Sequence, residues 1–424
     1  MNDQTLFLIE KSIIVLAVFG GVMLIVALTT LVERRVAGFI QDRYGPNRVG
    51  PFGILQPAAD GLKNFLKEET MPAAAAQPYF WLAPVISLAP ALVTFAVVPF
   101  AAPLPIGDYV VQMIVADVPI GILYILALSS LGVYGVVMGG WASNNKFSFL
   151  GGLRASAQMV SYEVALGLAV VVVLLLAGNV TLTEMVWQQQ QLNFWFVLPI
   201  SLAFILFVIS AFAETSRMPF DMPEAESELV GGFHTEYSGM KYAMYPMGEY
   251  SHMITSSALM ATLFFGGWDI PFWTGDDAFL YQDQWIRGFT EAGAPIAAEL
   301  AWWKTFLTFG AFAAKTYFFV LFYIWVRWTV PRFRYDQIMQ LGWKVMLPVS
   351  LAYVMIVAGT ILALDQLDVS YGFTFGLALT VVSAICTGLF LLVLDRGRTL
   401  SGAASEAHRR FTAERKALSA PHGD

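Results

Sequence analysis

Residues 155–177 read ASAQMVSYEVALGLAVVVVLLLA, a stretch of 23 residues with a single ionisable side chain, Glu163. The uncharged part, residues 164–177, is too short to cross a bilayer, which takes about 20 residues. Extension to residue 155 gives a sufficient length and puts Glu163 roughly 13 Å below one surface, at 1.5 Å per residue. A carboxyl group at that depth is costly, so it indicates a functional site. The alternative is a neutral carboxyl that only hydrogen-bonds two helices together.

The rest of the chain has the same character. Of its 424 residues 57% are hydrophobic and 13% are charged, and the mean hydropathy is +0.64. We predict an all-α membrane protein with about nine transmembrane helices in a polytopic domain, residues 1–394, followed by a cytoplasmic tail, residues 395–424. The predicted spans are 13–32, 81–103, 118–141, 155–177, 193–213, 243–267, 305–326, 345–364 and 372–394.

Lysine and arginine residues predict the orientation. Of the 24 bases, 20 fall in alternate loops and in the tail, which predicts an N-terminus outside and a C-terminus in the cytoplasm. The first loop, 33–80, and an acid-rich loop, 214–242, are then cytoplasmic, and the loop 268–301 is external. No basic segment or cleavage site accompanies the first apolar stretch, so we expect that helix to be retained.

Several chemistries are disfavoured. A single cysteine, Cys386, cannot hold an iron–sulfur cluster, and the four histidines have no metal-ligand spacing. No glycine-rich nucleotide motif opens a strand–turn–helix, and a net charge of −7 gives no support to nucleic-acid binding. We therefore predict a chain with no metal and no redox centre of its own.

The first loop contains an amphipathic helix. Residues 33–69 read ERRVAGFIQDRYGPNRVGPFGILQPAADGLKNFLKEE. At 100° per residue, Gln56 and Lys63 lie on the same face of the helix as Asp60. Leu62 lies on the opposite, apolar face, and Pro57 stands near the first turn. Such a helix either anchors the loop at the membrane surface or forms a wall of a lipophilic entrance; periodicity alone does not choose between them.

The acid-rich loop is the second unusual feature. Residues 213–237 read AETSRMPFDMPEAESELVGGFHTEY, and the only nearby bases are Arg217 and Lys241. Its carboxylates are Glu214, Asp221, Glu224, Glu226, Glu228 and Glu236. The spacing of Asp221 and Glu224 is also that of a helix capping box, which would explain those two acids but not the others.

Three further ionisable residues belong to predicted spans. Lys315 is eleventh in the span 305–326, where it cannot reach either surface and needs a buried acid, water or a lowered pKa. Glu249 lies near the start of the sixth span and Glu214 ends the fifth. With Glu163, these residues predict a polar path from the cytoplasmic loop into the membrane.

These motifs, from about residue 31 to 348, resemble the quinone-tunnel membrane subunit of respiratory complex I, which is called H in bacteria and NADH dehydrogenase subunit 1 in mitochondria. The resemblance implies a first loop that lines a quinone tunnel and a chain of carboxylates that carries protons. It implies tunnel roles for Arg34, Arg43, Gln56, Asp60, Leu62 and Lys63. It implies a proton path of Glu163, Glu214, Glu249 and Lys315. A coupling loop would hold Arg217, Asp221, Glu224, Glu226, Glu228 and Glu236.

The resemblance also implies a setting. The chain would be a non-redox subunit of NADH–quinone oxidoreductase in the bacterial inner membrane, inactive alone, with quinone as the substrate of the complex. FMN and iron–sulfur clusters would belong to partners, namely peripheral quinone-site subunits, alongside small membrane subunits. The rivals are the equivalent subunit of a membrane-bound hydrogenase or ferredoxin-linked complex, and an independent ion transporter. The full first-loop pattern argues against the hydrogenase, and the lack of an internal repeat weakens the transporter.

Overall fold

The computed structural model describes residues 3–106, 109–192, 194–221, 231–271, 273, 278–281, 284–289, 295–369 and 371–395. Within these ranges the chain is mostly helical. The longer helices are α1 (Asp3–Ile40), α3 (Gln77–Val93), α4 (Gly121–Ala142), α5 (Lys146–Ala177), α7 (Ser201–Glu214), α8 (Gly239–Phe264), α9 (Trp302–Thr329), α11 (Leu347–Gln366) and α12 (Phe373–Asp395). The shorter ones are α2 (Gln56–Leu66), α6 (Leu182–Leu192) and α10 (Tyr335–Gln340).

The helices are those of a multi-pass membrane protein. Among the described residues, 7 helical segments are long and apolar enough to cross a bilayer: α1, α3, α4, α5, α9, α10 to α11, and α12. Each corresponds to a predicted span. The two remaining predicted spans correspond to α7, an apolar helix of 14 residues, and to α8, of 26 residues. The count of nine and the orientation remain predictions.

Several predicted boundaries differ from the structure: α1 extends beyond the predicted span 13–32 at both ends, and α7 begins eight residues after the predicted start at 193. The span 81–103 was too long, because the α3 helix and its 3-10 extension η2 (Thr94–Val97) end before Pro99, and the residue before a proline disfavours the helical conformation. The helix containing Glu163 was too short, because α5 begins at Lys146, where the Asn145 side chain accepts a hydrogen bond from the amide of Phe147. A π-helical turn, η4 (Leu341–Met346), joins α10 to α11.

Two small sheets were not predicted. Strands β1 (Leu104–Ile106) and β2 (Tyr109–Val111) form an antiparallel pair between α3 and α4. Strands β3 (Phe279–Tyr281), β4 (Gln284–Phe289) and β5 (Pro295–Ala297) form an antiparallel sheet in the loop predicted to be external. Both lie in short segments rich in β-branched and aromatic residues, where hydropathy gives no signal.

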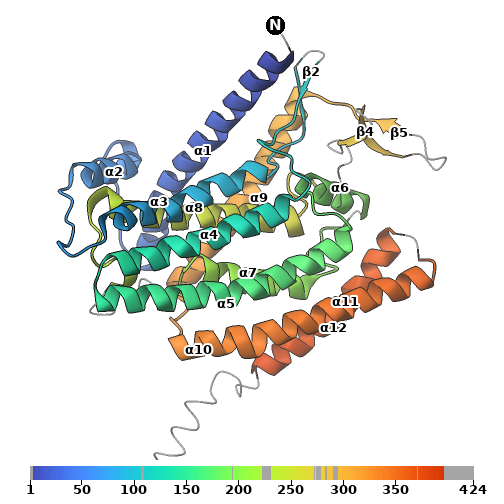
Figure 1. The fold of residues 1–424 in the computed structure, drawn as a ribbon. Helices are drawn as coiled ribbons and strands as arrows, with labels where there is room; N and C mark the ends of the chain where they lie inside the picture. Colours follow the sequence, from blue (N-terminus) through green and yellow to red (C-terminus); the bar gives the residue numbers. More distant parts are fainter. Residues whose placement is uncertain are drawn as a thin grey trace, which may run out of the picture.

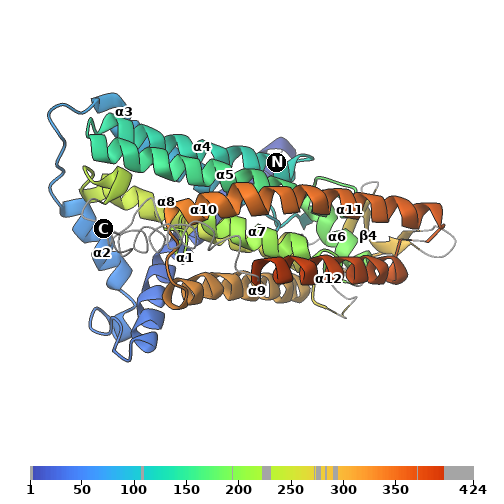
Figure 2. The same cartoon turned by 90° about the horizontal axis from the view of Figure 1, so that it is seen from below.

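The long helices form one bundle. Helix α4 packs on α3 and α5, α5 packs on α7 and α11, and α8 packs on α3 and α9 (Figure 1). In both views α2 and the first loop lie at one end of the bundle and β4 lies at the other (Figures 1 and 2). The first loop and the three-stranded sheet therefore lie at opposite ends of the bundle.

Small residues bring the helices close together. A Cβ atom on Gly135 of α4 would lie 2.7 Å from the Ser87 amide nitrogen of α3, and one on Gly140 would lie 2.7 Å from the Ser148 carbonyl of α5. Close approach over glycine is a usual basis of helix association in membranes. It leaves little room for large side chains around the middle of α4, where the polar residues described below are found.

Candidate functional site: a cavity at the first loop and a buried carboxylate cluster

A large cavity lies between α1, α2, α8 and α9. Its volume is about 970 Å³. Along α1 the lining changes from apolar, at Met23 and Val26, to charged, at Glu33 and Arg34. Ten residues of helix separate Met23 from Glu33, about 15 Å at 1.5 Å per residue. The cavity thus suits an elongated molecule with an apolar body and a polar end.

Helix α2 forms one wall of this cavity. Pro57 stands in its first turn, none of its residues is buried, and its lining side chains include Ala58 and Leu62. The predicted amphipathic helix is confirmed. It lies beside the cavity with both apolar and polar side chains in the lining, and its role as the wall of a lipophilic entrance stays a prediction.

Asp60 is the polar centre of α2. Its carboxylate is 2.5 Å from the Nη1 of Arg34 and 3.9 Å from the Nζ of Lys63, and it accepts a hydrogen bond of 3.1 Å from Gln56. Arg34 and Asp60 line the cavity, as does Arg43. The structure thus brings together the six residues predicted from the first loop, four on the cavity wall and two, Gln56 and Lys63, beside Asp60.

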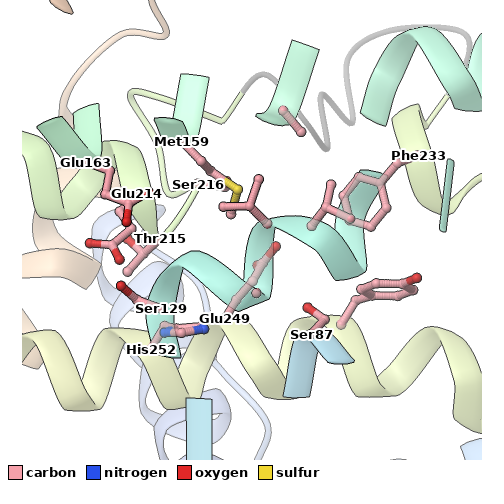
Figure 3. Close-up of a pocket in the computed structure, with 15 residues that line it drawn as sticks. Ser87, Ser129, Met159, Glu163, Glu214, Thr215, Ser216, Phe233, Glu249 and His252 are labelled. Carbon is pink, nitrogen blue, oxygen red and sulfur yellow. The ribbon is translucent and has the colours of Figure 1, made fainter. Parts of the chain in front are cut away.

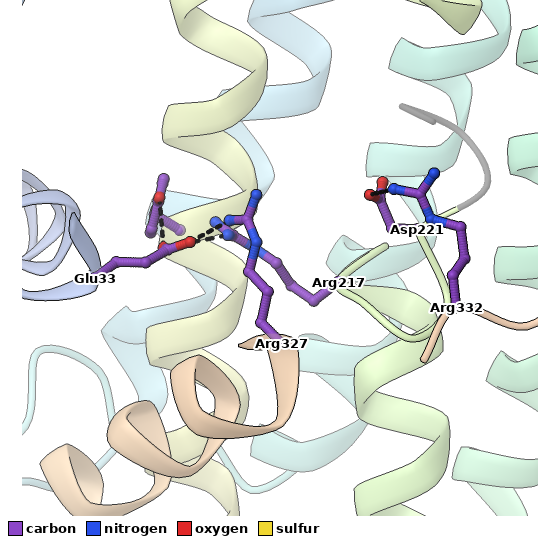
Figure 4. A network of polar contacts seen from close by, with 6 residues as sticks. Glu33, Arg217, Asp221, Arg327 and Arg332 are labelled. Carbon is purple, nitrogen blue, oxygen red and sulfur yellow. Dashed lines mark hydrogen bonds and ion pairs between the residues drawn. The ribbon is translucent and has the colours of Figure 1, made fainter. Parts of the chain in front are cut away.

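Glu33 joins three distant segments. Its carboxylate forms ion pairs with Arg217, at 3.4 Å, and with Arg327 of α9, and it accepts a 2.6 Å hydrogen bond from the Tyr250 hydroxyl of α8 (Figure 4). The Glu33 and Arg217 side chains are 6% and 7% exposed. The Arg217 guanidinium also lies 4.0 Å from the centre of the Tyr250 ring. Burial makes this network sensitive to the loss of any partner.

A second pair borders the same cavity. Arg332, in the segment after α9, donates a 2.8 Å hydrogen bond to Asp221 (Figure 4). Asp221 therefore has an arginine partner, in addition to the capping role that its spacing suggested. Glu236, the other described acid of this loop, accepts a 2.7 Å hydrogen bond from Asn145 and so ties the loop to the start of α5. Glu224, Glu226 and Glu228 lie outside the described residues.

A small cavity inside the bundle collects the buried carboxylates. It measures about 30 Å³ and is lined by Glu163 of α5, Glu214 of α7 and Glu249 of α8, among others (Figure 3). Ser130 donates a hydrogen bond to Glu163. Ser216 and Glu249 line this cavity and the large one as well. Three of the four predicted path residues therefore meet at one place, next to the large cavity.

Lys315 lies apart from these carboxylates. Its Nζ donates to the carbonyl oxygens of Phe265 at 2.7 Å, Gly267 at 3.0 Å and Asp269 at 2.5 Å, where α8 ends. Burial raises the pKa of the Asp269 carboxyl, and the Lys315 ammonium acts in the opposite direction. The need for buried partners was predicted correctly, but the partners are mainly backbone carbonyls.

Several residues of the site could not be recognised in the sequence. Glu33 was read only as part of a motif, because at the end of an apolar helix it looks like an interfacial residue. Arg327 and Arg332 are among the 20 bases that predict the orientation, and nothing in the sequence sets them apart. Tyr250 and His252, which belong to α8, gave no signal beyond helical spacing next to Glu249. Only the packing of α1, α8 and α9 brings them to the cavities.

Comparison with known proteins agrees with this arrangement. Residues 13–358 match the family described as NADH dehydrogenase. An H subunit of NADH-quinone oxidoreductase from Cytophaga hutchinsonii is 45% identical over 356 residues, 84% of this chain and 98% of that protein. The H subunit from Rhodospirillum centenum is 46% identical over 353 residues, 83% of this chain and 94% of that protein. The NADH-ubiquinone oxidoreductase chain 1 of Chondrus crispus is 45% identical over 362 residues, 85% of this chain and all of that protein.

The fold and the two cavities define a polytopic helical membrane protein with a charged cavity at one end of its bundle and carboxylates inside it. The length and the sequence identity of the matches show which family the chain belongs to. The chain belongs to the NADH dehydrogenase family of membrane subunits, together with the H subunits of NADH-quinone oxidoreductase.

Removal of the Glu33 charge tests the buried network. Glu33→Gln leaves the guanidiniums of Arg217 and Arg327 without their carboxylate, and breaking a buried pair costs about 3–5 kcal/mol. We expect a marked loss of assembled complex and a lower unfolding temperature, measured on native gels and by thermal denaturation in detergent. Asp336→Asn is the control, because Asp336 and Arg334 form an exposed pair at 4.0 Å that is worth at most about 1 kcal/mol. Equal effects of the two variants would contradict the role given to Glu33.

Proposed function

We propose that this chain forms the membrane side of the quinone-binding chamber of a proton-pumping NADH–quinone oxidoreductase, and the start of its proton-coupling path. The observation that carries the proposal is the contact between the two cavities, because Glu249 and Ser216 line both. A reaction in the large cavity would act directly on the buried carboxylates. We infer the reaction from the relatives, which are named as subunits of NADH-quinone oxidoreductase.

The large cavity suits a quinone with an isoprenoid tail. Its apolar part along α1 and α2 would take the tail, and the charged part around Arg34, Asp60 and Arg217 would face the polar ring. Methionine side chains at Met23, Met218, Met240 and Met247 add a flexible lining. Methionine adapts readily to ligands of irregular shape.

The carboxylate cluster suits proton transfer. Glu163, Glu214 and Glu249 share a cavity, and like charges this close cannot all stay ionised at low cost. A charge change at the quinone would act electrostatically on these carboxylates and so on the protons that they hold. Lys315, held by the backbone carbonyls just beyond the end of α8, would be the fourth member of the path.

The coupling loop would connect these two places. Arg217 and Asp221 line the large cavity, and Glu214 and Ser216, next to them in sequence, line the small one. Glu224, Glu226 and Glu228, which lie outside the described residues, would belong to the same coupling loop. The chain would act only in the assembled complex in the bacterial inner membrane, with FMN and iron–sulfur clusters in partner subunits.

A bulky residue in the wall of α2 tests the chamber. Ala58→Phe adds volume to the cavity lining, and overpacking costs about 1–3 kcal/mol. We expect kcat/KM for a long-tailed quinone to fall roughly tenfold or more, since about 1.4 kcal/mol is a factor of ten, with a smaller loss for a short-tailed analogue. Leu66→Phe is the control, because Leu66 belongs to α2 but is not among the residues that line the cavity. Equal losses for both tail lengths would contradict a tunnel along α2.

Replacement of Glu163 by a neutral residue tests the proposed proton path. Glu163→Gln keeps the shape and the contact with Ser130 but removes the titration. A positioned acid or base contributes typically 10²–10⁴-fold, so we expect quinone-linked NADH oxidation and pumping to fall by roughly tenfold or more. The NADH–ferricyanide rate of the same membranes should not change. Unchanged pumping in a fully assembled complex would reduce Glu163 to a structural hydrogen-bond acceptor.

A further inference from the structure

His252 is an ionisable group inside the bundle that the proposed path does not use. It belongs to the middle of α8 and lines the small carboxylate cavity (Figure 3). It also lines a second small cavity, again of about 30 Å³. Within the part of the chain that the structure describes, neither nitrogen of its imidazole has a protein hydrogen-bond partner. The ring therefore faces the two cavities.

The second cavity continues where the first ends. On α8 the first cavity is lined by residues from Tyr245 to His252, and the second by residues from His252 to Leu259. The wall that they share contains Ser129, Glu214, Thr215 and His252. In Figure 3 the Ser129 hydroxyl is drawn between the Glu214 carboxylate and the His252 imidazole.

Both cavities have the size that a water molecule requires, and polar groups lie on the wall that they share. A water molecule needs roughly 10–15 Å³ of accessible space and two to four polar partners. Each cavity offers about 30 Å³, with Glu214, Ser129 and His252 on the shared wall. Burial of an imidazole with no hydrogen bond would be costly, and water removes that cost. At the far wall, Ser256 is 3.1 Å from the Tyr323 hydroxyl of α9.

The first cavity places this ring among other ionisable groups. These are Glu163 of α5, Glu214 of α7, and Tyr245 and Glu249 of α8 itself, whereas α3 and α4 contribute serine hydroxyls and apolar groups. Three acids therefore surround one base. Helix α4 also leaves space for the ring, since a Cβ atom on Gly132 would lie 3.4 Å from its Nε2.

We propose that His252 is a second proton-holding group that exchanges a proton with Glu214 through water in the two cavities. The Glu214 carboxyl releases its proton to a water molecule, which passes one of its own protons to a free imidazole nitrogen. A carboxylate and an imidazolium replace two neutral groups, and total charge is conserved. Histidine is a common proton shuttle because its ring has two distinct nitrogens, one of which can accept a proton while the other donates one. This inference rests on the proposed proton path and adds one residue to it.

The test compares three variants in assembled complex reconstituted into vesicles. His252→Gln removes the proton-holding group, and we expect the rate of proton pumping to fall roughly tenfold, with a changed pH profile and an unchanged NADH–ferricyanide rate. Thr360→Val is the control, because Thr360 bonds only to the Ile356 carbonyl of its own helix, α11, away from both cavities. Glu163→Gln serves as the reference for the path itself.

The outcomes separate the two proposals. If Glu163→Gln lowers pumping but His252→Gln matches the native protein at every pH, the role of His252 is overturned and the path stands. If neither variant lowers pumping, the path fails and the role of His252 fails with it.

If His252→Gln assembles poorly, a spectroscopic measurement on the native protein gives an independent test. Isotopically labelled histidine identifies imidazole bands in the infrared difference spectrum between oxidised and reduced complex. We expect a label-sensitive band that reports imidazole protonation on quinone reduction and that is lost in His252→Asn. Absence of any such band in the native complex would overturn the proposal.

Discussion

The carboxylate of Glu33 is the contact on which the site depends. It is almost fully buried and is held by Arg217, Arg327 and the Tyr250 hydroxyl, which come from the loop after α7, from α9 and from α8. Removal of ions from water is expensive, and the cost is offset only when each charge keeps well-placed partners. The network therefore sets the relative positions of α1, α8 and α9, and with them the shape of the large cavity.

The second constraint is the contact between the large cavity and the small carboxylate cavity, which are both lined by Ser216 and Glu249. Glu249 lies one residue before Tyr250, so the helix that contributes to the Glu33 network also carries the carboxylate that faces the small cavity. Ser216 and Arg217 form a similar pair at the end of α7. In the proposed function, these adjacent residues would link charge changes in the large cavity to the carboxylates inside the bundle, because charges interact strongly in a low dielectric.

Much of this arrangement follows from the sequence. The apolar stretches predicted the helices, and the periodicity of residues 55–66 predicted α2, because both signals are local. The depth of Glu163 in the bilayer stays a prediction, since α5 begins at Lys146, nine residues before the predicted span. The Glu33 network did not follow, since it joins residues 184 and 294 positions apart and depends on how three helices pack. Nor did the partners of Lys315, because backbone carbonyls at a helix end leave no mark in the sequence.

The two small sheets mark another limit. Strands of three to six residues in a polar loop are stabilised by cross-strand pairs, which hydropathy does not report. His252 is a similar case. A single histidine in an apolar helix is uninformative until the cavities beside it are known, and then it becomes the only base among the three carboxylates that line them, within the described residues.

The central claim, that the large cavity receives the quinone, has a direct test. A quinone with a photoreactive group on its ring, added to the assembled complex and activated by light, labels the side chains that it contacts. The account predicts labelled peptides from the end of α1, from α2 and from residues 216–250, with labelling reduced by excess unmodified quinone. Labelling confined to other parts of the chain, or to partner subunits alone, would contradict it.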